Sequence, residues 1–172
     1  MNVTGGKFKG QKISAPDESI TRPTLSKVRM AVFNTLQSMI KFEGNSFLDM
    51  FSGSGIMALE AISRGFSEVT AFEKHPKAAA IIQKNFKNFH PSPLLIKADA
   101  IKGVQKLDKT FDCIYIDPPY YSGIYEQSLN AVRKYACGIV VLEHVINVDF
   151  NGFEVLKQKQ YGDKFVTFLK PV

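Results

Sequence analysis

The chain has 172 residues, of which 45% are hydrophobic and 22% are charged. This length suits one compact domain, and the composition excludes an intrinsically disordered chain. No apolar run approaches the roughly 20 residues needed to span a bilayer, and the first residues lack the pattern of a secretory signal. We therefore expect a cytoplasmic protein that does not bind membranes.

Cys113 and Cys137 lie in stretches typical of a buried strand and a helix end. Neither they nor the three histidines show the spacing of a metal site or of a disulfide framework. We expect both cysteines to be small buried hydrophobic residues, and we expect the protein to bind no metal.

Residues 1–41 hold seven lysines and arginines but only two acidic residues, Asp17 and Glu18. The formal net charge of the whole chain is +6, so most of its positive excess lies in this segment. Such a segment is suited to a polyanion, because lysine and arginine neutralise phosphates and release counterions. The alternative is a basic segment that only keeps the protein soluble.

Residues 1–24 are expected to form an extension that precedes a main domain of residues 25–172. The stretch 3–13, VTGGKFKGQKI, contains two short β-prone pieces separated by glycines. It predicts a small β-hairpin. Pro16 and the sequence TRPT at 21–24 indicate an irregular connector.

Apolar residues at helical spacing then predict a helix over 25–42, with Thr24 or Ser26 as its N-cap. From there strands and helices alternate. Strands are predicted at 46–50, 68–73, 94–97, 111–117 and 138–143, and helices at 55–64, 76–89, 100–107 and 123–136. Two alternating runs around Gly162 and Asp163 predict a terminal antiparallel hairpin. The pattern indicates an α/β fold with a seven-stranded, mostly parallel, doubly wound sheet.

A glycine-rich turn follows the first strand of this series, which ends at Asp49. The turn runs through Gly53 and Gly55, where the absence of Cβ lets the backbone approach a ligand closely. The next strand ends in Glu73, which is placed to accept both hydroxyls of a ribose. A carboxylate at Asp49 suits a cationic ligand, such as a sulfonium that carries an α-amino group.

The same turn has two other interpretations. Residues 53–58 fit the pattern G-x-G-x-x-G/A, and Glu73 lies twenty residues after Gly53, so a nicotinamide dinucleotide site is possible. Two features argue against a dinucleotide site. The motif typically lies at the start of a fold, and the Asp49 carboxylate would lie near the negatively charged pyrophosphate. A simple turn without a ligand also stays open.

A second motif, Asp117-Pro118-Pro119-Tyr120, ends the most apolar strand. Neither proline has an N–H to donate, so the motif offers the Asp117 carboxylate and the Pro118 carbonyl as acceptors. Acceptors on both N–H bonds of a base amine favour its pyramidal form and free the lone pair to attack a sulfonium methyl group. Tyr120 offers a flat face on which the base can stack. The alternative is a Pro-Pro turn with Asp117 as a cap.

Several motifs together resemble the RsmD-type 16S ribosomal RNA guanine-N2 methyltransferases. They are VTGGKFKGQKI at the N-terminus, TRPT-x-x-x-VR ending at Arg29, FLDMFSGSGIMALEAISRG, the strand end at Glu73, and DPPY at 117–120. The last motif is shared with DNA adenine-N6 enzymes, so the N-terminal motifs carry the family assignment. The resemblance implies a Rossmann-like class I methyltransferase that uses S-adenosyl-L-methionine to methylate the N2 amine of a guanine in small-subunit ribosomal RNA.

Carried onto this chain, the resemblance implies a set of cofactor contacts. Asp49 and the turn after it would line the methionine end, Glu73 would hold the ribose, Lys74 would flank the adenine, and Asp99 with Ala100 would meet the adenine amine. The implied cofactor-binding residues are Asp49, Phe51, Ser52, Gly53, Ser54, Gly55, Glu73, Lys74, Asp99 and Ala100.

The resemblance also implies how RNA is bound. Asp117, Pro118, Pro119 and Tyr120 would hold the target base. The extension would bind RNA, with Lys7, Lys9 and Lys12 on phosphates and with Arg22, Thr24 and Arg29 at the mouth of the pocket. Met30 stands where an acidic residue is expected, which concerns RNA docking and not the chemistry.

The expected partner is ribosomal RNA or the small ribosomal subunit, bound by a monomer. The main rival is a DNA or RNA adenine-N6 methyltransferase, but a DNA enzyme of this kind usually has an extra region for reading base edges, for which this chain has no room. A non-catalytic RNA-binding protein and an NAD-dependent oxidoreductase are more remote alternatives.

Overall fold

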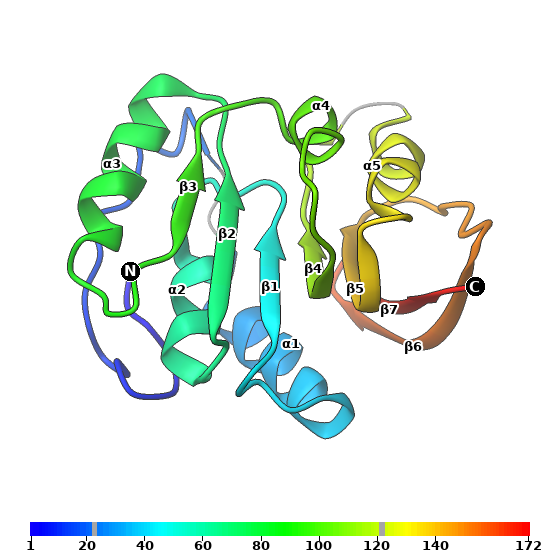
Figure 1. Ribbon diagram of the computed structural model, residues 1–172, viewed down its shortest axis with the longest axis horizontal. Helices are drawn as coiled ribbons and strands as arrows, with labels where there is room; N and C mark the ends of the chain where they lie inside the picture. The colour runs from blue at the N-terminus through cyan, green and yellow to red at the C-terminus, as the bar shows by residue number, and fades with distance from the viewer. Residues whose placement is uncertain (22–23, 121–122) are drawn as a thin grey trace.

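The computed structural model describes residues 1–21, 24–120 and 123–172. The described residues form one seven-stranded sheet in the order β3-β2-β1-β4-β5-β7-β6 (Figure 1). Neighbouring strands from β3 through β5 are parallel, and β7 is antiparallel to both β5 and β6. The strands are β1 (Ser46–Asp49), β2 (Glu68–Phe72), β3 (Leu94–Ile96), β4 (Phe111–Ile116), β5 (Ala136–His144), β6 (Phe153–Tyr161) and β7 (Lys164–Pro171). The predicted fold class and terminal hairpin are confirmed.

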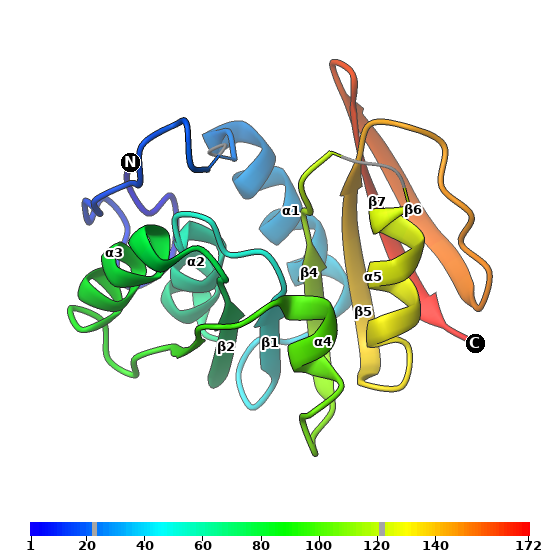
Figure 2. The ribbon, with the colours of Figure 1, turned by 90° about the horizontal axis from the view of Figure 1, so that it is seen from above.

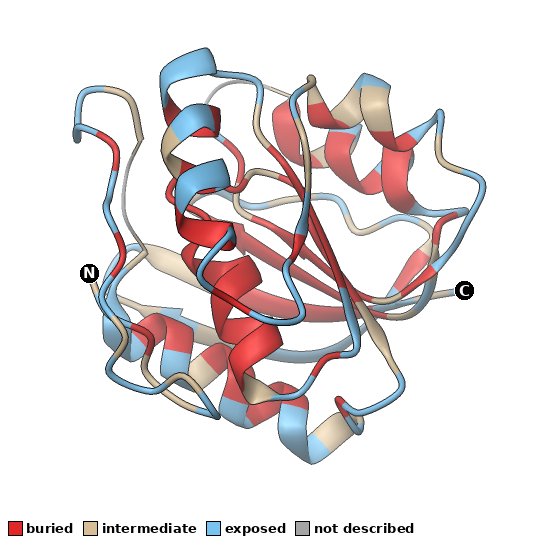
Figure 3. Ribbon diagram, turned by 60° about the vertical axis from the view of Figure 1, so that its left-hand side comes forward, coloured by how far each residue is buried: buried red, intermediate tan, exposed pale blue. Residues whose placement is uncertain are grey.

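Helices cover both faces of the sheet, and each helix after the first connects two successive parallel strands. They are α1 (Ser26–Met39), α2 (Ile56–Arg64), α3 (Pro76–Phe86), α4 (Ala100–Val104) and α5 (Ile124–Val132). The strands alternate their side chains between the faces, so Phe47 packs with α1, α2 and α3 while Leu48 packs with α4 and α5. Figure 2 shows α1 and α4 on opposite sides of the sheet. Buried residues run through the strands between these layers (Figure 3).

The strand order reverses direction between β1 and β4. From β1 the chain builds outward to β2 and β3, whereas β4 and β5 continue on the other side. The loops after β1 and β4 therefore leave the sheet in opposite directions and open a crevice at the carboxyl ends of the strands. The glycine turn follows β1 and the DPPY motif follows β4, so the topology brings the two motifs to this crevice.

The N-terminal extension forms the predicted hairpin, but its two arms are short. They meet at an antiparallel bridge between Asn2 and Lys12, where the amides of Val3 and Ile13 donate to the carbonyl oxygens of Gln11 and Met1 at 3.0 Å and 2.9 Å. The backbone between the arms binds the end of α2: the amide of Lys7 donates to the carbonyl oxygen of Ser63 at 2.7 Å. Gly6 has φ +76°, and a Cβ there would lie 1.9 Å from that oxygen. Because the amides of Thr4, Lys7 and Phe8 all bond to α2, they cannot extend the pairing of the two arms into longer strands.

Three further details correct the sequence analysis. The N-cap of α1 is Leu25, which has no side-chain cap, in place of the predicted Thr24 or Ser26. Cys113 is buried as expected, but Cys137 is exposed near the start of β5. Helix α5 begins at Ile124 and ends at Val132, four residues before the predicted end. Among the helices described, none has the length and apolar character to cross a membrane.

Candidate active site

A cavity of about 580 Å³ opens at the carboxyl ends of the parallel strands. Its walls come from the turn after β1, the end of β2, the start of α4 and the DPPY segment after β4. Most of the residues predicted for the cofactor and the base meet here: Phe51, Ser52, Gly53, Ser54, Glu73, Lys74, Asp99, Ala100, Asp117, Pro118, Pro119 and Tyr120. Thr24, predicted at the mouth of the pocket, also lines it.

The glycine turn is held between the sheet and α3. The amide of Ser52 donates to the carbonyl oxygen of Phe72 at 2.9 Å, which joins the turn to β2. Gly55 is the N-cap of α2 with φ +81°, a conformation that favours glycine. A Cβ at Gly55 would lie 3.0 Å from the ring of Phe86 and 3.1 Å from Ile82. Gly55 therefore lies behind the turn against α3, and Gly53 and Ser54 line the cavity.

Asp49 is fully buried beneath this turn. Its Oδ2 accepts a hydrogen bond from the Ser52 hydroxyl at 2.8 Å, whereas Oδ1 has no hydrogen-bond partner in the described part of the chain. Burial and, to a lesser extent, the nearby Glu73 carboxylate raise the pKa of Asp49 to about 7, while the Ser52 hydrogen bond opposes the rise. A buried acceptor without a partner is costly in an apolar setting. It suits a cationic group bound over the turn.

Glu73 closes the other side of the turn. Its Oε2 accepts from the amide of Gly53 at 2.9 Å, and its Oε1 accepts from the amide of His75 at 2.8 Å. Two backbone donors fix the carboxylate at the cavity wall. Each carboxylate oxygen can accept a second hydrogen bond, so both oxygens can still receive hydroxyl donors.

Asp99 and Ala100 lie at the far end of the cavity, where β3 leads into α4. Asp99 is the N-cap of α4, and its Oδ1 accepts from the amide of Lys102 at 3.0 Å. Ile101 adds an apolar surface to the same wall. This end therefore combines a carboxylate with apolar side chains, which fits a flat aromatic ring with an exocyclic amine.

Asp117 lies one residue beyond β4, with its side chain 17% exposed. Its Oδ1 is 3.6 Å from the ammonium nitrogen of Lys164. Burial and the Glu143 carboxylate raise the pKa of Asp117 to about 7, while Lys164 opposes the rise. Pro118 is buried and Tyr120 is 39% exposed. The segment thus places an acceptor in the cavity wall beside an accessible aromatic ring.

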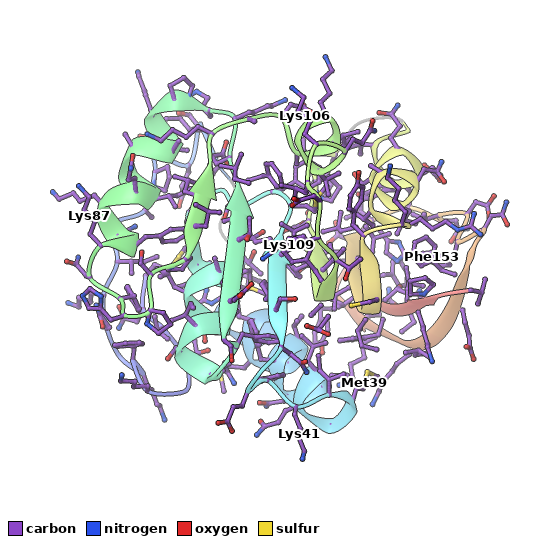
Figure 4. All side chains as sticks on the ribbon, viewed as in Figure 1. Met39, Lys41, Lys87, Lys106, Lys109 and Phe153 are labelled. Atoms are coloured by element: carbon purple, nitrogen blue, oxygen red, sulfur yellow. The ribbon has the colours of Figure 1, made fainter. Side chains whose placement is uncertain are left out.

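The residues predicted to bind RNA do not all lie on the surface of the protein. Lys7, Lys9 and Lys12 are exposed on the N-terminal extension, and Arg22 lies outside the described residues. Exposed lysines also project from other parts of the molecule, among them Lys41, Lys87 and Lys106 (Figure 4).

Arg29 is not available to RNA, which corrects its prediction. Its side chain is 2% exposed, and its Nε is 3.4 Å from Oε1 of the fully buried Glu60. Its terminal nitrogens donate to the carbonyl oxygens of Thr24 and Asn2 at 2.7 Å and 2.9 Å. Because Thr24 lines the cavity, Arg29 supports the cavity wall from behind. Its charge is neutralised inside the protein.

Other residues of the site were not predicted from the sequence. Ile20 and Thr21 of the connector line the cavity, but their sequence carries no motif beyond the nearby TRPT. Glu143 is the eighth residue of β5 and is fully buried. An acidic residue at the end of an apolar strand is the feature that identified Glu73 and Asp117, so it could have identified Glu143. Nothing in the sequence around Lys164 distinguishes it from other lysines.

Known proteins resemble this chain over most of its length. Residues 1–170 match the family described as conserved hypothetical protein 95. The ribosomal RNA small subunit methyltransferase D of Buchnera aphidicola is 33% identical over 134 residues, which are 77% of this chain and 69% of that protein.

Two solved structures share the fold. The yhhF protein of Escherichia coli superposes with a TM-score of 0.87 at 20% identity and covers 99% of this chain and 97% of its own. The precorrin-6y C5,15-methyltransferase of Geobacter metallireducens superposes with a TM-score of 0.70 at 19% identity and covers 93% and 94% of the two chains. From the family match and the aligned relative together, the chain belongs to the conserved hypothetical protein 95 family, the RsmD family of methyltransferases.

Proposed function

We propose that this protein transfers a methyl group from S-adenosyl-L-methionine to the exocyclic N2 amine of a guanine in small-subunit ribosomal RNA. One observation carries the proposal: Asp117, Gly53 and Glu73 line the same cavity. An amine held at the DPPY segment would therefore lie beside a cofactor held over the glycine turn.

The chain has groups that fit each part of this cofactor. Asp49, with its buried Oδ1, would attract the α-amino group, and Glu73 would accept from the ribose hydroxyls. Asp99 would accept from the adenine amine. Once bound, the cofactor supplies a methyl group on a positively charged sulfur.

Asp117 and the Pro118 carbonyl would hold the amine by accepting its two N–H bonds. The ring delocalises the lone pair of such an amine, and two acceptors favour the pyramidal form in which the lone pair points away. The amine held in this way would take the methyl group that the bound cofactor supplies, and the product nitrogen would then lose a proton to water. Positioning and electrostatics supply most of the acceleration, because this proton is acidic and needs no strong base.

The substrate part of the proposal is drawn from the relatives. The Buchnera protein carries a name that specifies small-subunit ribosomal RNA. The exposed Tyr120 suits an unstacked base, and the basic extension suits RNA recognised through its shape and phosphates. A monomer remains our expectation.

Transfer of labelled methyl groups to three substrates tests the proposal. Small ribosomal subunits, naked small-subunit RNA and duplex DNA are incubated with the protein, and the labelled nucleoside is identified by mass spectrometry. We expect N2-methylguanosine in ribosomal RNA, in the subunit or free. N6-methyladenine in DNA or RNA would identify the main rival activity and contradict the proposal.

A further inference from the structure

Three charged groups from three strands meet at the sheet edge beside the DPPY segment. Asp117 follows β4, Glu143 lies near the end of β5, and Lys164 begins β7. Because β7 runs antiparallel to β5, the first residue of β7 lies at the carboxyl end of β5. The fold thus brings a lysine from the terminal hairpin to the same edge as two carboxylates.

Glu143 fixes the position of this lysine. Glu143 is fully buried, and its Oε2 accepts from the Lys164 ammonium at 2.5 Å. Its Oε1 accepts from the hydroxyl of Tyr115, a buried residue of β4. Both carboxylate oxygens are therefore bound, and the lysine has a fixed anchor with a side chain only 16% exposed.

The ammonium of Lys164 faces the DPPY segment. It lies 3.6 Å from Oδ1 of Asp117 and 6.0 Å from the ring centroid of Tyr120. Lys164 is absent from the lining of the cavity, whereas Asp117 and Tyr120 belong to it. Its positive charge thus acts on the site from behind the acceptor.

We infer that Lys164, held by Glu143, is a positioning residue that keeps Asp117 ionised and oriented to accept the amine of the base. This inference rests on the proposed function, because it assigns a role in holding the amine. An ionised carboxylate accepts hydrogen bonds at both oxygens, whereas the protonated form carries an O–H donor. Only the ionised form suits an N–H bond at either oxygen.

The charges around Asp117 show why such a residue is needed. Burial favours the protonated form of Asp117, as do Glu143 from β5 and Asp49 from β1, and these influences raise its pKa. Tyr115 of β4 and Tyr125 of α5 are neutral neighbours whose own pKa values are raised, first by burial. Burial disfavours the charged form of Lys164, but Asp117 and Glu143 raise the pKa of this lysine, so it stays positive. Lys164 is thus the cation that opposes protonation of Asp117 within the described cluster.

The dependence of the methyl-transfer rate on pH tests the inference. The rate should be high above the pKa of Asp117 and should fall as the pH drops through it. In Lys164→Met this fall should move to higher pH by about one unit or more, because an adjacent opposite charge lowers a carboxyl pKa by about 1–3 units. The variant should lose about tenfold in rate near pH 7 and recover toward the wild-type rate above pH 9.

Two further variants separate charge from structure. Lys164→Arg keeps the positive charge and should restore a profile close to that of the wild type. The double variant K164M/E143Q removes both partner charges without leaving Glu143 buried and unpaired, so it protects the fold. In this double variant, the fall in the methyl-transfer rate should occur at lower pH than in Lys164→Met. An equal loss of rate at every pH in Lys164→Met, without a shift, would overturn the inference.

A titration without substrate distinguishes this inference from the proposed function. The protein is prepared with ¹³C-labelled aspartate, and the Asp117 carboxyl signal is assigned by its absence in Asp117→Asn. Its titration should move to higher pH in Lys164→Met and stay near the wild-type position in Lys164→Arg. An unmoved titration contradicts the role of Lys164. A wild-type protein that methylates no guanine in ribosomal RNA contradicts the proposed function, whatever the titration shows.

Discussion

The two halves of the cavity are assembled from different parts of the chain. Most of the half proposed for the cofactor comes from residues 46–73, where a strand, a glycine turn, a helix and a second strand follow one another, and Asp99 completes it. In the half proposed for the amine, Asp117 lines the cavity, and Glu143 and Lys164 from two later strands lie behind it. The groups that would contact the ligands could therefore be identified from contiguous motifs in the sequence. The charges that tune these groups come from strands that only the topology brings together.

The halves also differ in how they hold a carboxylate. Asp49 is hydrogen-bonded to Ser52 and retains an oxygen without a partner in the described chain, whereas Asp117 has an ammonium at 3.6 Å. Both pKa values are raised to about 7, mainly by burial. The cation for Asp49 would be the α-amino group of the bound cofactor, whereas the cation for Asp117 is Lys164 of the protein itself.

The largest expected effect is a loss of methyl transfer that leaves cofactor binding almost unchanged. Asp117→Ala removes an acceptor from the amine half and should lower the methyl-transfer rate by about 10²–10³-fold, the range found when one preorganised hydrogen-bonding group is lost. Binding of S-adenosylmethionine, measured by calorimetry, should change little. A variant as active as the wild type would show that the amine is held elsewhere.

A second substitution disturbs only the cofactor half. Gly55→Ala places a methyl group 3.0 Å from the Phe86 ring at φ +81°. Gly44 has the same φ and nothing within 4 Å, so Gly44→Ala is a matched control. Left-handed backbone costs about 1–2 kcal/mol in both variants, and overpacking adds about 1–3 kcal/mol in Gly55→Ala.

Chemical denaturation measures both glycine variants. Equal losses of unfolding free energy would mean that the contact between the glycine turn and α3 has no energetic role. Binding of S-adenosylmethionine should weaken in Gly55→Ala alone, because only that glycine supports the turn.

A third prediction uses the raised pKa of Asp49. Burial moves this pKa from 3.8 to about 7, so between these values the folded protein binds more protons than the unfolded chain. The unfolding free energy contributed by this group therefore falls as pH rises from about 4 to about 7. Above pH 7, Asp49→Asn should not show this loss and should be more stable than the wild type by up to about 4 kcal/mol, because each unit of pKa shift corresponds to about 1.4 kcal/mol.

The gain in Asp49→Asn should be accompanied by weaker cofactor binding. Calorimetry should show an affinity for S-adenosylmethionine reduced by about tenfold, which corresponds to a lost charge-assisted hydrogen bond. If the variant binds the cofactor as tightly as the wild type, Asp49 is not the partner of the α-amino group.

The smallest effect concerns the surface away from the cavity. The triple variant K7A/K9A/K12A should weaken RNA binding and reduce the slope of log K against log salt by up to about two, since each phosphate contact contributes about 0.7 on single strands. A matched variant, K41A/K87A/K106A, removes three exposed lysines from other parts of the surface (Figure 4). If both variants change the slope equally, the N-terminal extension has no special role in RNA binding.

The fold was largely predictable, because nearly continuous apolar strands alternate with amphipathic helices. The predicted hairpin is shorter than its sequence indicates because residues 4–8 bond to α2, a tertiary contact that β-propensity does not record. Arg29 looked like a surface cation, and only the packed structure pairs it with Glu60. The two motifs of the site were visible because each is contiguous. The role of Lys164 was not visible in the sequence, because its proximity to Asp117 depends on how β7 pairs with β5.

The most direct test of the account is mass mapping of small-subunit ribosomal RNA from cells that lack the gene, with either the wild-type protein or the Asp117→Ala protein restored. The account predicts that one N2-methylguanosine is missing in the deletion strain, returns with the wild-type protein and stays missing with Asp117→Ala. An unchanged modification pattern in the deletion strain, or full restoration by Asp117→Ala, would contradict it.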